Sequence, residues 1–402
     1  MLSAYVLGVY LKKHSVQTMF VSLLKWFALF ILYFSFVLLV PLPNWSLEKD
    51  RADLIVADLH SHSLLSHDGV VTLQDNLRMH GQRGYNLVAL TNHASVTNGV
   101  IAYQAAYGVM PEAVPGMEIP VYYGGHFYLS VVGMHADMHL PDGLVWYQGE
   151  VKPPMAAEAL PEHCWTVKKL IQCVHEHGGA IAVVALHLDA EEVRGLAGAG
   201  VDAFEIVNFG HHSLPEDVRQ VMLQVEKEQG IALIASNDWH GWTGMLNTWT
   251  LIQNDDIHDS LETRVLNVLR QHHGDAVIPV TAYPIHEMSV MEMIGAPFMA
   301  VFQYAKTLSK AQLTAWWGYF FIFMLLAKHW RWQKVSLSMA TQHLLLLGMS
   351  TALLWHGISL YQAWLISEIR PPLAWQVSLY SMVVASFVLF LEGYRLRWLM
   401  FK

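Results

Sequence analysis

Residues 58–69 of this chain read Asp58-Leu59-His60-Ser61-His62-Ser63-Leu64-Leu65-Ser66-His67-Asp68-Gly69, directly after an apolar run. Side chains two apart on a strand point to the same face, so His60 and His62 can address one cation from a strand end. The loop that follows can fold Asp68 back towards them. A surface loop in a chain with 23 histidines is the alternative, and the rest of the sequence has to decide between the two.

Residue types that bind metals recur at the ends of further apolar runs. These residues are His93, Glu118, His126, His187 and the pair Asp238 and His240. In α/β folds with parallel strands, reactive groups collect at the carboxyl ends of the strands. We therefore expect an α/β barrel or sheet whose rim brings these side chains together, although they are spread over about 180 positions.

The ordered set of motifs resembles the PHP (polymerase and histidinol phosphatase) family of metal-dependent phosphoesterases, over about Asp58 to Gly241. The resemblance implies a distorted (β/α)7 barrel that holds two or three divalent ions. It also implies nine ligand positions, each occupied here by a residue type that can bind a metal: His60, His62, Asp68, His93, Glu118, His126, His187, Asp238 and His240.

Several positions depart from the family pattern or leave a choice open. Asn92 stands where the family has an aspartate before the histidine, and an amide there can still orient a ligand. Leu188 replaces the proline after His187, which changes the stiffness of the loop. Two ligand positions have rivals close by in the sequence: His67 competes with Asp68, which we prefer, and His135 competes with His126.

Imidazole and carboxylate ligands suit Zn, Mn or Fe, and no motif contains a cysteine, which argues against a structural thiolate zinc site. A carboxylate such as Glu118 can bridge two cations. Paired cations would activate water and clamp the attacking and leaving oxygens of a phosphate ester. The expected nucleophile is therefore a metal-bound hydroxide, and no side chain is assigned a catalytic role of its own.

The apolar fraction of 54% is concentrated at the two ends of the chain. Residues 20–40 are predominantly apolar, interrupted by Lys25, and are long enough to cross a bilayer. Three further candidate spans follow, at about 313–327, 335–355 and 375–391. We expect an N-terminal anchor (1–43), a metal-dependent hydrolase domain (44–287), a connecting segment (288–310) and C-terminal transmembrane helices (311–402).

Net charge differs between the expected hydrolase domain and the expected membrane segments. Residues 44–287 contain 12 basic and 30 acidic residues (net −18), whereas the remainder contains 12 basic and 3 acidic residues (net +9). The basic residues flank the spans as the positive-inside rule requires, which predicts a multi-pass membrane protein with its catalytic domain on the non-cytoplasmic face. If residues 288–305 also span, the number of spans becomes odd and the side of the domain is ambiguous. The acidic domain argues against nucleic acid as a partner.

Three other features draw attention. His211 and His212 follow a strand-like run and could touch substrate at the barrel rim. Arg194 is the most plausible phosphate contact among the arginines near the motifs. His343 lies inside a candidate span, where an interhelical hydrogen bond is favoured over a functional pathway.

Together, these features predict a phosphoesterase that is tethered to a lipid bilayer and hydrolyses a phosphate ester at a centre of two or three metal ions. A catalytically silent sensor or scaffold is the main alternative. A hydrolase of the same metal type that acts on an amide or cyclic ester is a further alternative.

Overall fold

The computed structural model describes residues 16–40, 46–47, 51, 53–93, 111–123, 125–133, 145–146, 167–184, 188–208, 214–242, 246–254, 256, 258–282, 289–292, 295, 298–299, 302, 305, 308–329, 337–366 and 370–400. The chain forms two compact units. The helical unit comprises Met1–Val40, Pro297–Tyr361 and Gln376–Lys402, and the sheet unit comprises Pro41–Ala296 and Gln362–Trp375. The domain limits expected from the sequence stay predictions.

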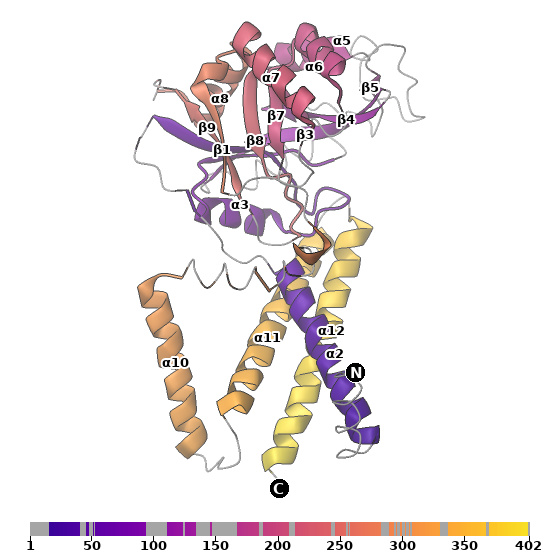
Figure 1. The fold of residues 1–402 in the computed structure, drawn as a ribbon, viewed down its shortest axis with the longest axis vertical. Coiled ribbons are helices and arrows are strands. Elements are labelled where there is room, and N and C mark those ends of the chain that lie inside the picture. The colour runs from indigo at the N-terminus through magenta and orange to yellow at the C-terminus, as the bar shows by residue number, and fades with distance from the viewer. Residues whose placement is uncertain are drawn as a thin grey trace, which may run out of the picture. The chain divides into compact units, whose positions relative to one another are not determined.

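The sheet unit contains one sheet in which nine strands follow one another in the order β10-β9-β1-β2-β3-β4-β6-β7-β8, with β5 beside β3 (Figure 1). The strands are β1 (Leu54–Ser61), β2 (Leu87–Leu90), β3 (Glu112–Tyr123), β4 (Gly125–Val132), β5 (Val145–Trp146), β6 (Ala180–Val184), β7 (Ala203–Asn208), β8 (Ala232–Ser236), β9 (Thr248–Gln253) and β10 (Val277–Thr281).

The sheet nearly closes into a barrel, because the segment after β8 returns to β1. The amide of Asp238 donates to the carbonyl of His60 at 3.0 Å, and the amide of His62 donates to the carbonyl of Trp239 at 3.0 Å. Seven strands, β1 to β4 and β6 to β8, complete this circuit. The structure therefore confirms an α/β fold with a nearly closed, barrel-like sheet, whereas the PHP type of barrel stays a proposal.

One strand of the circuit runs against the others. β4 is antiparallel to both β3 and β6, whereas β1, β2 and β3 are parallel to one another, as are β6, β7 and β8. The start of β4 therefore lies at the same edge as the carboxyl ends of its neighbours. His126, which pairs with Tyr122 in this ladder, occupies that start.

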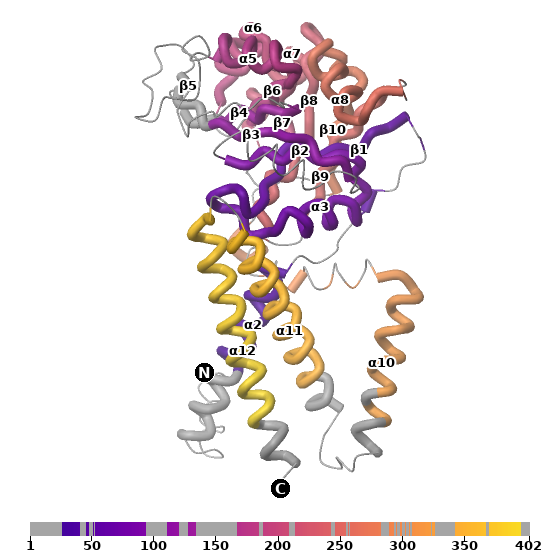
Figure 2. Tube along the Cα trace, turned by 180° about the vertical axis from the view of Figure 1, so that it is seen from behind, coloured from indigo at the N-terminus to yellow at the C-terminus, as the bar shows by residue number. Residues whose placement is uncertain are grey.

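Helices cover the outside of the barrel: α3 (Leu73–Gln82), α5 (Val167–Glu176), α6 (Ala190–Ala199), α7 (Glu216–Gln229) and α8 (Leu261–Arg270). α5, α6 and α7 gather on one side of the sheet and α3 lies on the other (Figures 1 and 2). Local sequence sets the helix ends: the Thr72 side chain caps α3 by accepting from the amide of Asp75, and Gly200 ends α6 in the left-handed conformation.

Alternation along β1 separates the barrel interior from the α3 side. Ile55 and Leu59 belong to a core cluster with residues of β2, β8 and α8, whereas Val56 packs in another cluster with Leu77 of α3. The register between β1 and β2 shifts after Asp58, which marks a β-bulge. A bulge re-aims the side chains that follow it.

The helical unit contains α2 (Val16–Leu39), α10 (Lys310–His329), α11 (Leu337–Ile366) and α12 (Pro372–Met400). Within the described residues, two helical segments are long and apolar enough to cross a membrane: Gln342–Ile366 of α11 and Pro372–Tyr394 of α12. The part of α2 from Trp26 to Leu39 is also apolar but shorter. The expectation of four spans stays a prediction. The helix expected at 335–355 extends to Ile366 and so includes a second histidine, His356.

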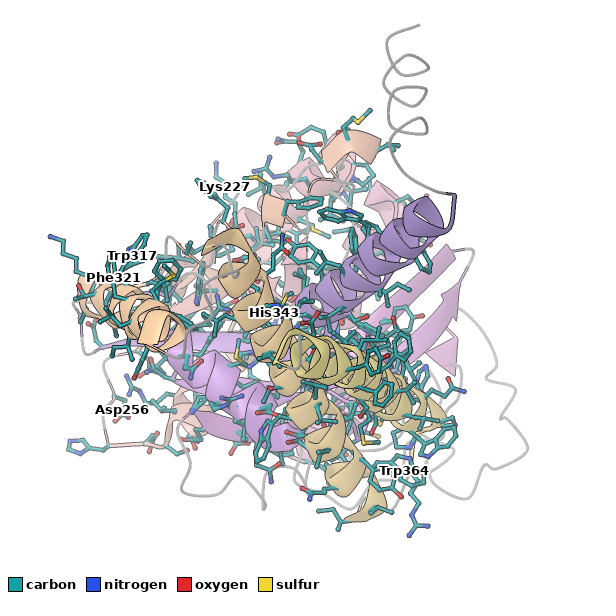
Figure 3. The ribbon with its side chains drawn as sticks, turned by 90° about the horizontal axis from the view of Figure 1, so that it is seen from below. Lys227, Asp256, Trp317, Phe321, His343 and Trp364 are labelled. Carbon is teal, nitrogen blue, oxygen red and sulfur yellow. The ribbon has the colours of Figure 1, made fainter. Side chains whose placement is uncertain are left out.

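α11 and α12 run antiparallel and are joined by polar contacts. Near one end His343 forms a short hydrogen bond with Glu392, and near the other Ser378 Oγ donates to the carbonyl of Gly357 at 2.7 Å. Both ionisable side chains are buried. The interhelical hydrogen bond favoured for His343 is therefore present. Figure 3 labels His343, and it also labels Trp317 and Phe321, whose side chains project from α10.

Candidate metal centre

Two groups of ligand-type side chains converge where the barrel circuit closes. The first group is His60, His62, Glu118 and Asp238, and all four side chains are buried. Asp238 Oδ1 lies 3.3 Å from His60 Nε2 and 3.1 Å from His62 Nε2. Glu118 Oε2 lies 3.3 Å from each of the same two nitrogens. Four potential ligand atoms therefore surround one point, which we call the deep group.

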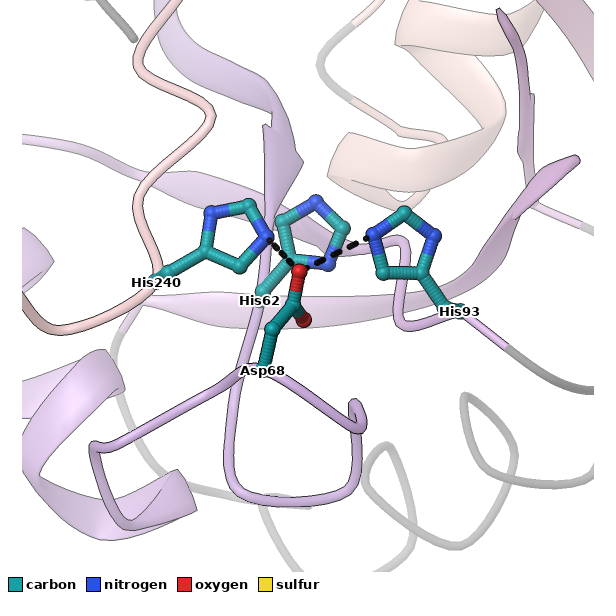
Figure 4. A group of neighbouring side chains, drawn as sticks. All are labelled: His62, Asp68, His93 and His240. Atoms are coloured by element: carbon teal, nitrogen blue, oxygen red, sulfur yellow. Dashed lines mark ion pairs between the residues drawn. The ribbon is translucent and has the colours of Figure 1, made fainter. Parts of the chain in front are cut away.

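The second group is His62, Asp68, His93 and His240, drawn in Figure 4. Asp68 Oδ2 lies 3.5 Å from His93 Nε2 and 3.2 Å from His240 Nε2. This outer group is more accessible, since the Asp68 side chain is 34% exposed and those of His93 and His240 are 16% and 18% exposed. Solvent therefore reaches the side chains of the outer group, whereas those of the deep group are buried.

Glu118 joins the two groups. Its Oε2 atom lies 3.3 Å from His93 Nε2 of the outer group, the same distance that separates it from the histidines of the deep group. The position of Glu118 on β3 is set by parallel pairing, because its amide donates to the carbonyl of Thr91 just after β2. This geometry suits the bridging role expected for Glu118.

The spacing of these atoms fits a divalent ion. Ligands bound at about 2.0–2.2 Å lie about 3.3–3.6 Å apart in tetrahedral geometry and about 2.8–3.1 Å apart along octahedral edges. The separations that involve His60 and His62 run from 3.0 Å, between His60 Nε2 and His62 Nε2, to 3.3 Å. A divalent ion at the centre of the group could therefore be reached by all of these atoms at ordinary ligand distances.

Charge around His60 points the same way. Burial by itself lowers the pKa of His60, but the carboxylates of Asp238, Glu205 and Glu118 outweigh burial and raise that pKa well above its ordinary value. Burial raises the pKa of Glu118, yet its contacts with His60 and His62 bring it well below the ordinary range. The buried carboxylates therefore require a cation, which can be a proton or a metal ion.

Backbone and side-chain contacts orient the rings. His240 Nδ1 lies 2.9 Å from the carbonyl of Asp238, to which it can only donate, so the neutral ring would leave its Nε2 lone pair for a cation shared with Asp68. His60 Nδ1 lies 2.8 Å from Glu205 Oε1 on β7. Such outer contacts fix the tautomer and orientation of metal-binding histidines. Glu205 was not predicted to belong to the centre; the available signal was a glutamate inside an apolar run that reads as a strand.

His67 and Asp68, the two alternative ligands in the loop after β1, differ clearly in position. Asp68 points into the outer group, whereas the His67 side chain is 72% exposed and its Nε2 lies 3.9 Å from Asp68 Oδ2. The geometry thus favours Asp68 as expected. Asn92 is buried, and its Oδ1 accepts from the amide and hydroxyl of Ser63 at 2.8 and 3.1 Å. It therefore anchors the loop after His62 and does not contact the ring of His93.

Several expected residues cannot be placed at the centre. His135, His187, His211 and His212 lie outside the described residues, and for His126 only the backbone position on β4 is described. Arg194 makes long hydrogen bonds to the carbonyl of Ala190 and to Gln224, at 3.4 and 3.5 Å, on the outer helices α6 and α7. Those contacts give no support to Arg194 as a phosphate contact.

No family model and no curated protein matches this chain. Solved structures similar to it include a Bifidobacterium adolescentis protein provisionally described as a metal-dependent phosphoesterase, at 15% identity and a TM-score of 0.36, covering 52% of this chain and 95% of that one. An amidohydrolase from Chromobacterium violaceum has 13% identity and a TM-score of 0.35, covering 55% and 97%. PsfC from Pseudomonas syringae has 13% identity and a TM-score of 0.37, covering 63% and 99%.

Proposed function

We propose that this protein is a metal-dependent phosphoesterase of the PHP type, with a centre of two or three divalent ions (Zn, Mn or Fe). One observation carries the proposal: Glu118 Oε2 stands 3.3 Å from histidine nitrogens of both ligand groups. A carboxylate shared between the two groups could bind an ion in each group and so bring the two ions next to each other. Adjacent divalent ions are the arrangement that phosphate ester hydrolysis uses most often.

The protein side chains have separate parts in this function. Bound divalent ions would supply an activated water and neutralise the charge of the phosphate. The deep group holds its ion in a fully buried frame, which favours a fixed geometry. Asp68, His93 and His240 form the accessible side, where the substrate would bind. Glu205 and the Asp238 carbonyl keep the ligand rings of His60 and His240 in the binding tautomer.

Metal content and turnover test the proposal together. The purified full-length chain is compared with a His60→Ala, Asp238→Ala double variant by elemental mass spectrometry, and both are assayed on phosphate monoesters and diesters. His258→Ala, at an exposed position outside the centre, is the matched control. Two or three equivalents of Zn, Mn or Fe, together with phosphate release, are expected in the wild type and the control only.

Both alternatives predict bound metal without phosphate release, so an additional assay on amides and cyclic esters separates them. An amide or cyclic ester hydrolase would hydrolyse these substrates, whereas a sensor or scaffold would hydrolyse none of them. The wild-type protein should be grown and purified with Zn, Mn and Fe supplied. If it then contains no metal, the proposal is wrong.

We also propose that the chain is an integral membrane protein with several spans and that residues 44–287 lie on the non-cytoplasmic face. The support is the two long apolar helices, the exposed aromatic and aliphatic side chains of α10, and the distribution of basic residues. Resistance to alkaline carbonate extraction tests membrane insertion. Labelling of a cysteine introduced at the exposed position of His258 by a membrane-impermeant reagent tests the side.

A further inference from the structure

Helix α3 carries two fully buried polar side chains, Asn76 and His80, one turn apart. Residues at i and i+4 lie on the same face of a helix, so both side chains leave α3 in the same direction. Burying an amide and an imidazole is unfavourable unless each is hydrogen bonded. Both have partners on β1 or directly after it, in the segment that carries His60 and His62.

The contacts of Asn76 and His80 reach the segment that carries the ligands. Asn76 Nδ2 donates to Ser61 Oγ at 2.9 Å and to the carbonyl of His62 at 2.7 Å. His80 Nε2 lies 2.9 Å from Asp58 Oδ2, and His80 Nδ1 lies 2.9 Å from the carbonyl of Asn76. The β-bulge after Asp58 lets that carboxylate face α3 while His60 faces the centre.

The carboxyl group of Asp58 has contacts from three parts of the chain. Its Oδ1 accepts from the amides of His60 and Asn237 at 3.2 and 3.3 Å, and its Oδ2 accepts from Asn237 Nδ2 at 2.7 Å. The ring of His80 adds the fourth contact, from Nε2 to Oδ2. These four contacts fix the position of the carboxyl group between α3, the backbone of His60 and Asn237.

The same carboxylate supports a strained ligand. Asp238 has a φ of 48°, in the left-handed region that non-glycine residues rarely occupy. Such conformations persist only where surrounding contacts hold them. Here the preceding residue, Asn237, is tied to Asp58 by two hydrogen bonds, and the amide of Asp238 donates to the carbonyl of His60. The spacing between the β1 ligands and Asp238 therefore depends on Asp58.

We propose that His80, acting through Asp58 and aided by Asn76, is a positioning residue that sets the geometry and metal affinity of the deep group. This inference rests on the proposed function, because it assumes that the deep group binds a divalent ion. His80 touches no ligand side chain of the deep group in the described contacts. Its effect passes through one carboxylate to the backbone of His60 and to Asn237, which precedes Asp238.

Three variants of the full-length protein test the proposal, with Mn²⁺ alone as the probe. His80→Leu removes both hydrogen bonds, and His80→Gln keeps a donor towards Asp58. His175→Leu is the matched control, because His175 Nε2 also lies 2.8 Å from an aspartate, Asp202, in a similar pair before β7 and away from the centre. Mn²⁺ affinity and the electron paramagnetic resonance spectrum of the bound ion are measured, with thermal unfolding of the metal-free proteins alongside.

His80→Leu should weaken Mn²⁺ binding by about 10- to 100-fold, as loss of an outer contact to a ligand commonly does, and change the spectrum of the bound ion. His80→Gln should restore most of the affinity and the spectrum. His175→Leu should lower thermal stability and leave both metal properties unchanged.

Each result has a separate meaning. Wild-type protein that binds no Mn²⁺ would remove the proposed function and this inference with it. Wild-type affinity and spectrum in His80→Leu would overturn the inference alone, and so would equal losses of affinity in His80→Leu and His175→Leu. If His80→Leu does not fold, His80→Ala replaces it and should show the same loss of Mn²⁺ affinity and change of spectrum. Wild-type affinity and spectrum in His80→Ala would overturn the inference.

Discussion

Glu205 Oε1 lies 2.8 Å from Nδ1 of His60 inside the barrel, and both side chains are completely buried. The two residues are 145 positions apart in the chain and meet because β8 alone separates β7 from β1 in the barrel circuit. A carboxylate at one ring nitrogen makes that nitrogen the protonated one. The other nitrogen, Nε2, is then free to bind a cation together with Glu118 and Asp238.

Replacing Glu205 should weaken metal binding without removing it. Glu205→Gln keeps the size of the side chain but loses the negative charge that orients and polarises His60, so the dissociation constant should rise by about 10-fold or more. Isothermal titration with Zn²⁺ measures it. Glu216→Gln, at an exposed position on α7, is the matched control and should bind as the wild type does. Unchanged affinity in Glu205→Gln would count against a ligand role for His60.

The loop after β1 offers a direct test of which residue binds. Asp68→Asn should lose the ion of the outer group, because Asp68 Oδ2 is the carboxylate oxygen that lies 3.5 Å from His93 Nε2 and 3.2 Å from His240 Nε2. His67→Ala should keep the metal content of the wild type, since His67 is largely exposed. Elemental mass spectrometry of the two variants decides between them. Loss of metal in His67→Ala with retention in Asp68→Asn would reverse the assignment.

Removing the metal should destabilise the sheet unit. Without a cation, Glu118 and Asp238 repel each other in a buried site, and a ligand at 100 times its dissociation constant adds about 2.7 kcal/mol to the free energy of unfolding. Thermal unfolding with and without a chelator measures the change. The His60→Ala, Asp238→Ala variant serves as the control, and its melting temperature should not respond to added metal.

The pH dependence of the metal-free chain follows from the two histidines whose pKa values are raised. Burial lowers the pKa of His60 and of His240, but nearby carboxylates outweigh burial and raise both. These histidines bind more protons when folded, so stability should fall as pH rises above the ordinary histidine pKa of about 6.5. His62, whose pKa is lowered by burial, contributes the opposite slope near pH 6.5, where the unfolded state still binds a proton, and none once both states are neutral at higher pH.

Bound metal should reverse this trend, because it replaces the protons and competes with them. Denaturant unfolding between pH 6.5 and 9, in chelator and in Zn²⁺, would reveal the reversal. Metal-free stability that rises over this range would contradict the prediction.

In the helical unit, His343 and Glu392 should be strongly coupled. Both are buried, and removing one partner leaves the other without its hydrogen bond. His343→Leu and Glu392→Leu should each lower thermal stability, and the double variant should be more stable than the sum of the single losses allows. A double-mutant cycle measures the coupling, which averages about 0.6 kcal/mol for hydrogen bonds between membrane helices and is larger for buried charged pairs. Strictly additive losses would show that the pair contributes nothing.

Local patterns predicted much of the site. The i, i+2 spacing of His60 and His62 was enough to place both rings together, because side chains on a strand alternate with a period of two. Asp68 and Glu118 could likewise be named from their places after apolar runs. The reversal of β4 was not predicted, because a strand's direction depends on the neighbours it pairs with and not on its own residues.

The sequence by itself determined which residue types stand at the strand ends, and therefore that this chain carries the side chains of a metal centre. Only the tertiary structure decided that Glu118 lies between two groups, that Glu205 orients His60, and that Asp58 and His80 support the ligands from α3. The physical reason is the distance along the chain over which each property is set. The identity of a ligand and the alternation of side chains on a strand depend on neighbouring residues. The distances between ligands depend on strand order, register and a β-bulge, which arise only when distant segments pair.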